Sequence, residues 1–583
     1  MTSKLSEELD LAIYERGYQS FLLKRRKKNP LFNNNLDSFH KALASDNPQE
    51  EIQSIDPQSL YYSIKNCSPE TQIATLPLIS KDQLTRLFDY DVWTDNSLNI
   101  KRVCSWLSLL KQSSATDMLR KFNQLEEEYR LAILSPLVQF ITQEEFEKLG
   151  EQEQDTLFSL PGEEIFYKIT TDDKEIQQTI QSIIETAMGT DMNYTISLLA
   201  HASYLSSIES EELIARFRRA RMEEDGFVTY EESLGFFKPI NTDHLIEKWK
   251  KESTNTSSLL TKKEDNFLET VIKHISRTDC TAFENIEKSM TQTMNALCSV
   301  SQIESSDLSN LETIYEYARG SINLALEFLS NKNIDIACEI LKKEYTKSLF
   351  CFSASMYNDL RKHFIQNLEK FTNLPSNKLK DYLYKQKNGQ ILKWFDTNGL
   401  EYFGFERNET LKGLFNRFPV VPFPENTGEK LKFKVLSTLE DYEKLVSLVN
   451  TNSALLYLSF SSNTPLSKTT SLDKIIQNAS IQAICGNEFK NDPIRQEQVE
   501  KINNMDQDLW QKSKTFLLSS INILLNKDQI SEARESYVFS KYRNTPDNYV
   551  FLTVKEIENL LNEVQKIKTF EFDTLRNSHS LKD

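Results

Sequence analysis

The sequence predicts a predominantly all-α protein of stacked short helices, a HEAT-like or Arm-like helical repeat, with one small β-hairpin late in the chain. Two observations lead to this fold. Helix-start signals recur at short intervals between residues 56 and 232. The 583 residues include only 13 Gly and 15 Pro, which is few for a chain with many tight β-turns. Short helices cannot bury an apolar face alone, so we expect them to pack on one another.

The helix starts are recognised by their capping residues. Asp56-Pro57 and Ser68-Pro69 each place an N-capping side chain before a proline at the first helical position. Capping boxes, in which two side chains satisfy orphan backbone N–H groups, are predicted at Ser80–Gln83, Thr142–Glu145, Thr229–Glu232, Ser437–Glu440 and Thr553–Glu556. Between residues 56 and 149 we expect helices of roughly ten residues, starting near residues 56, 68, 80, 98, 115, 126 and 142.

Two stretches of biased composition suggest boundaries along the chain. Ser253–Ser258 is polar without periodicity and is typical of a linker. Around Pro419–Gly428 the sequence alternates like two short strands joined by a Pro/Asn/Gly turn, which predicts the hairpin. The helical units form either one continuous array or two blocks split near residue 255. The predicted domains are an N-terminal helical-repeat domain (1–252), a central basic and aromatic helical domain (259–418), a C-terminal helical domain with the hairpin (419–568) and a frayed tail (569–583).

Charge and apolar content exclude several classes of protein. The formal net charge of −16 disfavours a dedicated duplex-DNA binder, whose affinity comes mainly from cations that meet phosphates. No run approaches the roughly 18 apolar residues of a membrane-spanning helix. The basic cluster Lys24–Lys28 follows the first apolar stretch, the reverse of the order in a secretory signal. We therefore predict a cytoplasmic protein without a membrane span, whose seven scattered cysteines are free thiols.

One string has the outline of a calcium-binding loop. With Gly226 at loop position 6, Asp225 and Glu232 fall near ligand positions. Arg221, however, puts a cation where the loop needs its first carboxylate. A helix that ends at Gly226 as its C-capping glycine, followed by the Thr229 capping box, accounts for the string better. We predict no metal site and no cofactor.

Asp89 and Asp91, close to Trp93, are the first candidates for catalytic carboxylates. Residues two apart do not share a helix face, and a helix end followed by a turn at Asp95-Asn96 explains both acids more simply. No H-E-x-x-H or G-x-S-x-G motif occurs. No catalytic residue is therefore assigned, although an enzyme with dispersed acidic residues stays an alternative.

The strongest local charge lies between Lys342 and Lys393. This segment contains eleven Lys and Arg residues and four acids, so its net charge is +7 in a chain whose net charge is −16. Aromatic residues are interleaved with these cations. The segment is a solvated helical face, a docking surface for an acidic protein, or a track for single-stranded nucleic acid, which the overall charge disfavours. The predicted partner-binding residues are Lys342, Lys343, Lys378, Lys380, Lys385, Lys387 and Trp394.

Several stretches resemble an uncharacterised bacterial domain-of-unknown-function family: LPLISKDQLTRLFDYDVW, RVCSWLSLL, RARMEEDGFVTYEESLGFF and, more weakly, LKFKVLSTLEDYEKL and IQAICGNEF. The resemblance implies a large helical protein and brings no catalytic residue with it. Together with the helical architecture, it predicts a non-catalytic scaffold or adaptor that binds a protein partner. The alternatives are the enzyme with dispersed acids and a protein that binds single-stranded nucleic acid. The oligomeric state is not predicted.

Overall fold

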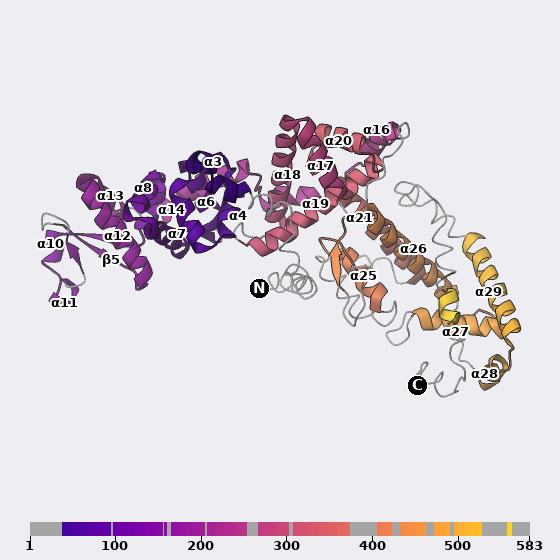
Figure 1. The fold of residues 1–583 in the computed structure, drawn as a ribbon. Coiled ribbons are helices and arrows are strands. Elements are labelled where there is room, and N and C mark those ends of the chain that lie inside the picture. Colours follow the sequence, from indigo (N-terminus) through magenta and orange to yellow (C-terminus); the bar gives the residue numbers. More distant parts are fainter. Residues whose placement is uncertain are drawn as a thin grey trace. The chain divides into compact units, whose positions relative to one another are not determined.

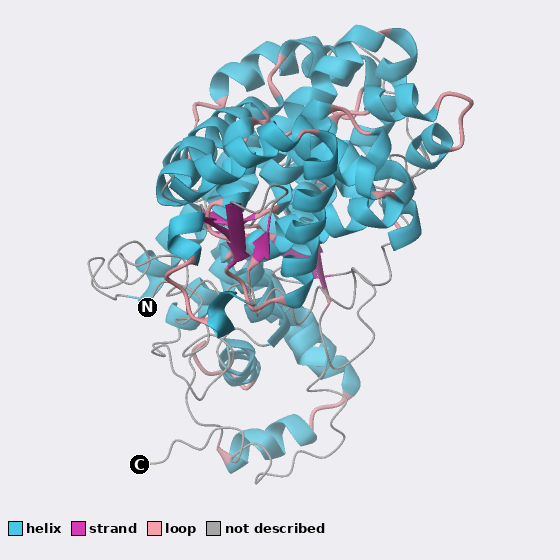
Figure 2. Cartoon of the chain, turned by 90° about the vertical axis from the view of Figure 1, so that its left-hand side faces the viewer, coloured by secondary structure: helices cyan, strands magenta, loops and turns pink. Residues whose placement is uncertain are grey.

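The computed structural model shows helices with a few short antiparallel strands, so the predominantly all-α fold is confirmed (Figure 1, Figure 2). No described helix is long and apolar enough to cross a membrane. All seven cysteines are free thiols, and five of them are buried. The structure describes residues 38–94, 97–154, 157–159, 165–204, 207–238, 240–253, 266–301, 307–372, 405–422, 432–461, 472–489, 495–527, 555 and 557–562.

The chain divides into two compact units, and each is discontinuous in sequence. The N-terminal unit comprises the described residues within 38–234 and 291–314. The C-terminal unit comprises the described residues within 235–290 and 315–562. The limits predicted for the domains stay a prediction.

Short helices make up most of the N-terminal unit. Their starts follow the predicted capping signals closely: Asp56 accepts the Ser59 N–H at 3.0 Å, and the capping boxes at Ser80, Thr142 and Thr229 are all formed. The helices are α3 (Pro48–Ser54), α4 (Pro57–Lys65), α5 (Pro69–Thr75), η1 (Leu76–Leu78), α6 (Lys81–Asp91), α7 (Ile100–Ser113), α8 (Ala115–Gln124), α9 (Glu127–Leu134), α10 (Gln143–Phe146), α11 (Glu151–Gln154), α12 (Lys174–Thr190), α13 (Met192–Tyr204), α14 (Ser207–Glu224) and α15 (Tyr230–Ser233).

A regular helical repeat is not confirmed in this unit. Its helices range from 4 residues in α10 to 18 in α14. Small sheets, which the sequence did not predict, also interrupt them. β1 (Trp93–Thr94) pairs with β2 (Ser97–Leu98), and β3 (Val138–Thr142), β5 (Ile165–Ile169) and β4 (Phe158–Ser159) form an antiparallel sheet in that order.

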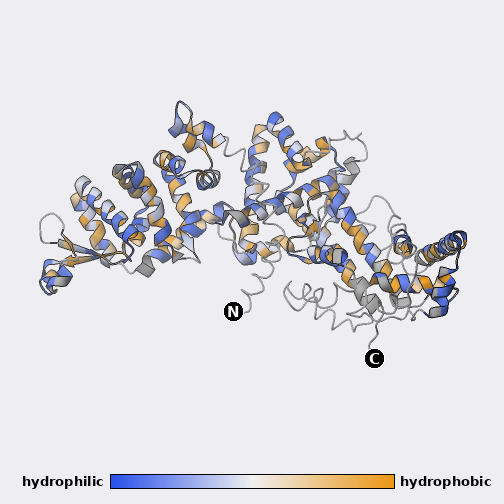
Figure 3. Ribbon diagram, turned by 60° about the horizontal axis from the view of Figure 1, so that its bottom comes forward, coloured by the Kyte–Doolittle hydropathy of each residue, from blue (hydrophilic) through white to orange (hydrophobic). Residues whose placement is uncertain are grey.

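Longer helices form the C-terminal unit, and Figure 3 shows apolar residues interspersed with polar ones along them. Aromatic side chains fill its core, including Tyr317, Phe350 and Tyr357, all of them buried. The helices are η2 (Leu234–Phe237), α16 (Asp243–Ser253), α17 (Phe267–Thr278), α18 (Cys280–Ser301), α19 (Leu308–Ser330), α20 (Ile334–Lys343), α21 (Thr346–Thr372), α25 (Phe405–Phe415), α26 (Leu439–Ser461), α27 (Leu472–Ile484), α28 (Gln496–Asn503) and α29 (Gln507–Lys527); η2, α18 and α19 also contribute residues to the N-terminal unit.

The late hairpin is confirmed. β6 (Val420–Pro422) pairs antiparallel with β7 (Phe433–Val435). The capping box predicted at Ser437 is wrong by one residue, because α26 begins at Leu439 and Thr438 accepts the Asp441 N–H at 3.2 Å. The Thr553 box, the Ser253–Ser258 linker beyond its first residue and the tail lie outside the described residues.

Candidate functional site

The two candidate carboxylates at the end of α6 are both buried, with exposed fractions of 0% for Asp89 and 4% for Asp91. Consecutive residues of a helix are about 100° apart around its axis, so these two side chains point in opposite directions. Each carboxylate accordingly has its own set of partners. The prediction that they do not share a helix face is confirmed, and the two acids do not form a catalytic pair.

Asp89 is held by Arg221 of α14. Arg221 donates from Nε to Asp89 Oδ2 at 2.6 Å and from Nη2 to Oδ1 at 3.0 Å, and Tyr129 donates its hydroxyl to Oδ1 at 2.7 Å. Burial alone would lower the pKa of Arg221, but its hydrogen bonds to Asp89 raise that pKa above the ordinary value. Burial raises the pKa of Tyr129 as well, and the Asp89 charge adds to this effect. Asp89 is therefore a buried partner of the Arg221 guanidinium and the Tyr129 hydroxyl, which is a structural role.

The segment from Arg221 to Glu232, whose sequence has the outline of a calcium-binding loop, forms the end of α14 and the turn that follows it. Gly226, with φ +93°, ends α14: its N–H donates to Glu223 O at 3.0 Å and the Phe227 N–H donates to Met222 O at 2.9 Å. This C-capping arrangement is the one predicted. Among the described residues, no group of three or more His, Cys, Asp or Glu side chains is placed to hold a metal ion.

Asp225, next to that glycine, ties three segments of the N-terminal unit together. Arg86 donates to its carboxylate at 2.9 Å and the Tyr90 hydroxyl at 2.6 Å. Asn295 of α18 donates to the Asp225 carbonyl at 2.6 Å and exchanges two hydrogen bonds of 2.8 and 2.9 Å with Gln58. Burial raises the pKa of Asp225, against the lowering effects of Tyr90 and Arg86.

Asp91 faces the other way, toward α4 and α7. Its Oδ1 accepts from the Tyr61 hydroxyl at 2.8 Å and lies 3.1 Å from Lys65 Nζ, and its Oδ2 accepts from Trp106 Nε1 at 2.5 Å. Arg102 donates to the Asp91 backbone carbonyl at 2.9 Å. Burial and the neighbouring Asp91 charge raise the pKa of Tyr61 well above its ordinary value, so this hydroxyl remains a donor.

An open polar hollow of about 310 Å³ lies beside Asp91. Four helices, α4, α5, α6 and α7, supply its lining. Arg102, Ser105, Trp106 and Leu109 follow one another at helical spacing along α7, so they share one face. The complete lining is Lys65, Gln72, Asp91, Arg102, Ser105, Trp106 and Leu109, and we call this site the Asp91 hollow.

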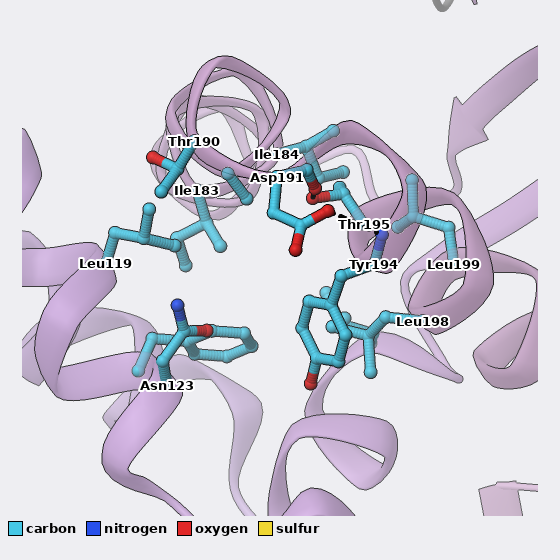
Figure 4. A pocket seen from close by; sticks show the side chains of 13 residues that line it. Leu119, Asn123, Ile183, Ile184, Thr190, Asp191, Tyr194, Thr195, Leu198 and Leu199 are labelled. Atoms are coloured by element: carbon cyan, nitrogen blue, oxygen red, sulfur yellow. Dashed lines mark hydrogen bonds between the residues drawn. The ribbon is translucent and has the colours of Figure 1, made fainter.

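A second pocket lies between α8, α12 and α13 and is much smaller (Figure 4). Its volume is about 40 Å³, and most of its lining is apolar, including Leu119, Ile183 and Leu198. Figure 4 shows Asp191 and Tyr194 at its edge, where the Tyr194 N–H donates to Asp191 at 3.0 Å. This space is too small for a metabolite, whereas the Asp91 hollow reaches the size of ligand pockets.

α14 has two apolar faces. One is buried and includes Ile214 and Met222. On the other, Leu213 and Phe217 are 41% and 45% exposed. Ala220 continues this face, because residues 213, 216, 217 and 220 have the spacing of one helix side. We call these four residues, Leu213, Arg216, Phe217 and Ala220, the α14 outer face.

The predicted partner-binding lysines lie only partly in the described residues. Lys342 is 3.2 Å from Asp279, and Lys343 is 2.8 Å from Glu339 one helical turn away. Lys343 Nζ also lies 5.8 Å from the centre of the Trp249 ring. Such exposed ion pairs are weak, so a partner can displace them, and the assignment stays a prediction. Lys378, Lys380, Lys385, Lys387 and Trp394 lie outside the described residues.

Sequence reasoning missed both the Asp91 hollow and the α14 outer face. The spacing of Leu213 and Phe217 was visible in the sequence, but which side of α14 would be covered was not. Comparison of the chain with curated proteins finds no match, and comparison with solved structures finds none either. A family profile matches residues 39–561, which is most of the chain, and the chain therefore belongs to a family of unknown function, DUF6178.

Proposed function

We propose that the protein is a non-catalytic scaffold or adaptor and that the α14 outer face binds a protein partner. The observation that supports this proposal is that α14 has a side packed against the unit and an opposite apolar side that is exposed. Its inner side packs against α6 and α9 and supplies Arg221 to Asp89. Its outer side leaves Leu213 and Phe217 substantially exposed to solvent. Exposed aromatic and aliphatic side chains that adjoin along a helix are typical of helix-mediated recognition.

The charges beside this face indicate the chemistry of the partner. Arg216 lies between Leu213 and Phe217, and Arg219 is exposed one position before Ala220. Neither arginine forms an ion pair with a described residue, whereas Arg218 and Arg221 on the inner side both bond to Asp89. The fitting partner is an apolar helix or strand bordered by Asp or Glu, which would cover the apolar residues and pair with the arginines.

The enzyme alternative draws no support from Asp89, because this side chain is fully buried and its partners are Arg221 and Tyr129. Asp91 lines the hollow and stays the acid to examine for that alternative. Binding of single-stranded nucleic acid would depend on the segment from Lys342 to Lys393, whose residues after 372 lie outside the described part.

The test is an affinity capture from native lysate, quantified for the unmodified chain and for two variants of the outer face. Phe217→Glu places a charge in the apolar patch, and Arg216→Glu reverses the charge beside it. We expect the same protein to be lost at least about tenfold from both variants, because interface anchors of this kind contribute 2 kcal/mol or more. Cross-linking should join α14 to a segment of that protein with acidic residues next to apolar ones.

The matched control is Phe516→Glu, the same substitution at a 75% exposed phenylalanine of α29. It should retain the partner fully, and all variants should have the melting temperature of the unmodified chain. Equal capture by both outer-face variants, or no captured protein, contradicts the proposal. Loss of the captured material after nuclease treatment assigns the binding to nucleic acid, and a smaller sedimentation coefficient for purified Phe217→Glu assigns the face to a second copy of the chain.

A further inference from the structure

The small pocket between α8, α12 and α13 combines an apolar lining with a single charged side chain. Leu119, Ile183 and Leu198 belong to the apolar part. Asp191 is the one charged residue among the lining residues, and it lies exposed at the turn between α12 and α13. Its Oδ1 accepts the Tyr194 N–H at 3.0 Å, and Figure 4 shows its other oxygen directed into the pocket.

The Asp191 carboxylate is available to a cation. Among the described residues, the Tyr194 N–H is its one hydrogen-bond donor, and no Lys, Arg or His pairs with it. Arg130 donates to the Tyr194 hydroxyl, and its guanidinium lies 5.6 Å from the centre of that ring, but Arg130 does not line the pocket. α12 ends beside the pocket at Thr190, without a basic residue in its last turn. Because the carboxyl end of a helix favours positive charge, this end adds to the attraction of the carboxylate.

The size of the pocket and a second polar group define what the cation must carry. The volume of about 40 Å³ is roughly three times the space that one water-sized probe needs, so it holds about three carbon atoms. An isopropyl group, the side chain of valine, has this size. Asn123 is an exposed lining residue of α8, and Figure 4 shows its amide across the pocket from Tyr194. An amide both donates and accepts hydrogen bonds, so it matches a peptide group.

From these features we propose that the pocket captures the amino-terminal residue of a polypeptide when that residue is valine or has a side chain of similar size. The side chain fills the apolar space, the α-ammonium pairs with Asp191 Oδ2, and Asn123 bonds to the first peptide group. An internal valine lacks the ammonium, and an amino-terminal glycine lacks the side chain. Capture of a chain terminus through its charge is a recurring mode of peptide recognition. The proposal is independent of the α14 outer face, because it uses none of its residues.

NMR titration of the full chain with labelled isoleucine methyl groups tests the site. Valinamide has the ammonium, the isopropyl group and an amide, N-acetylvalinamide lacks the positive charge, and glycinamide lacks the side chain. Each is added up to about 10 mM, ten times a Kd of 1 mM, at about pH 6.5, where an α-amino group is protonated. We expect valinamide to shift the methyl signals of Ile183 and Ile184, which line the pocket, and to bind at least about fivefold more tightly than the other two probes.

Asp191→Asn is the decisive variant. It removes the charge and keeps the helix cap, because asparagine and aspartate cap helices about equally well. We expect the affinity for valinamide to fall at least about fivefold. The matched control is Asp173→Asn, the same substitution at the N-cap of α12. Asp173 lies roughly 15 Å along the helix from Ile183, beyond the Debye length of about 8 Å, so the control should bind valinamide like the unmodified chain.

A second pair of variants tests the apolar part. Ala187→Leu places a larger side chain in the pocket and should abolish the binding of valinamide, because the space is then filled. Ala200→Leu makes the same change at a half-buried alanine of α13 that does not line the pocket, and it should leave the affinity unchanged. Retained melting temperatures in the variants ensure that a loss of binding reports on the pocket.

Three results would overturn the proposal. Unshifted signals of Ile183 and Ile184 at the highest valinamide concentration would show that the pocket does not bind the residue. Equal affinity of the unmodified chain and Asp191→Asn, or N-acetylvalinamide binding as tightly as valinamide, would show that the ammonium is not recognised. Glycinamide binding as tightly as valinamide would show that the apolar space contributes nothing.

Discussion

The carboxylate of Asp89 receives two hydrogen bonds from the guanidinium of Arg221, at 2.6 and 3.0 Å, across 132 positions of sequence. This bidentate pair joins the end of α6 to the inner side of α14. Because α14 also presents Leu213 and Phe217 to solvent, the pair sets the orientation of the outer face. The stability of the N-terminal unit and the geometry of the proposed partner site thus depend on the same contact.

Removing the charge of Asp89 should destabilise the N-terminal unit strongly. Asp89→Asn leaves Arg221 half-buried with only the more distant Glu126, at 3.3 Å, as a charged partner. We expect a loss of about 3 kcal/mol in the free energy of unfolding, measured by urea denaturation. Glu212→Gln, at an exposed acid of α14, should change it by less than about 0.5 kcal/mol. Similar free energies of unfolding for the two variants would show that the buried Asp89–Arg221 pair contributes little to the stability of the unit.

Gly226 should not tolerate a side chain. Its φ of +93° is strained for other residues, and a Cβ atom there would lie 2.6 Å from the Cα atom of Gln292. Gly226→Ala should therefore lower the melting temperature, with a destabilisation of at least about 1 kcal/mol. Gly189→Ala is the matched control in α12, where a Cβ meets nothing within 4 Å, and it should leave the protein equally or slightly more stable. Equal effects of the two substitutions would contradict the close approach at Gln292.

The Tyr61 hydroxyl should contribute to the burial of Asp91. Tyr61→Phe removes the donor at 2.8 Å and leaves a nearly buried carboxylate with one hydrogen bond fewer. We expect a loss of about 1.5–3 kcal/mol, the usual value for a hydrogen bond to a charged group. Tyr204→Phe removes a hydroxyl from an 81% exposed ring and should have no measurable effect. Chemical denaturation measures the free energy of unfolding of both variants. An unchanged free energy of unfolding for Tyr61→Phe would show that Lys65 and Trp106 alone are enough to stabilise the buried Asp91 carboxylate.

The C-terminal unit should lose stability in acid because of His363 in α21. Burial lowers the pKa of this 4% exposed imidazole to about 4, against a smaller raising effect of Asn450. The lowered pKa means that the folded state favours the neutral ring. This contribution is complete above the unfolded pKa of about 6.5 and is lost as the pH falls toward 4, by about 3 kcal/mol in all.

The measurement for His363 is the melting temperature between pH 7 and pH 4. His363→Gln cannot take up a proton, so its melting temperature should fall less steeply over this range than that of the unmodified chain. His40→Gln serves as the control and should follow the unmodified chain. A parallel decline for His363→Gln would mean that other groups govern the acid sensitivity.

Local signals made most helix starts predictable. Asp56, Ser80 and Thr229 cap their helices through atoms within a few residues, so the sequence alone contains the whole interaction. The end of α14 at Gly226 was predicted for the same reason. The short strands β3 and β5 were not, because five residues give little periodicity and their pairing, such as Phe140 with Tyr167, is non-local.

The candidate sites depended on tertiary contacts that no local pattern encodes. Asp91 could be singled out in the sequence, but its burial by Tyr61 and Trp106 and its place beside an open hollow required that α4 and α7 both contact the end of α6. The charge run from Lys342 is visible in the sequence because its cations lie close together along the chain. A single arginine in a hollow has no such compositional signature.

The bond between Asn295 and the Asp225 carbonyl bears on how the protein is made. A ribosome that has just added Asp225 must add about 70 more residues before Asn295 exists, which takes about 4 to 14 s at ordinary elongation rates. During that interval the turn at Gly226 and the amide of Gln58 lack their partner from α18, although all the preceding helices have been synthesised. The nascent chain is therefore exposed to chaperones and proteases for several seconds with this unit unfinished.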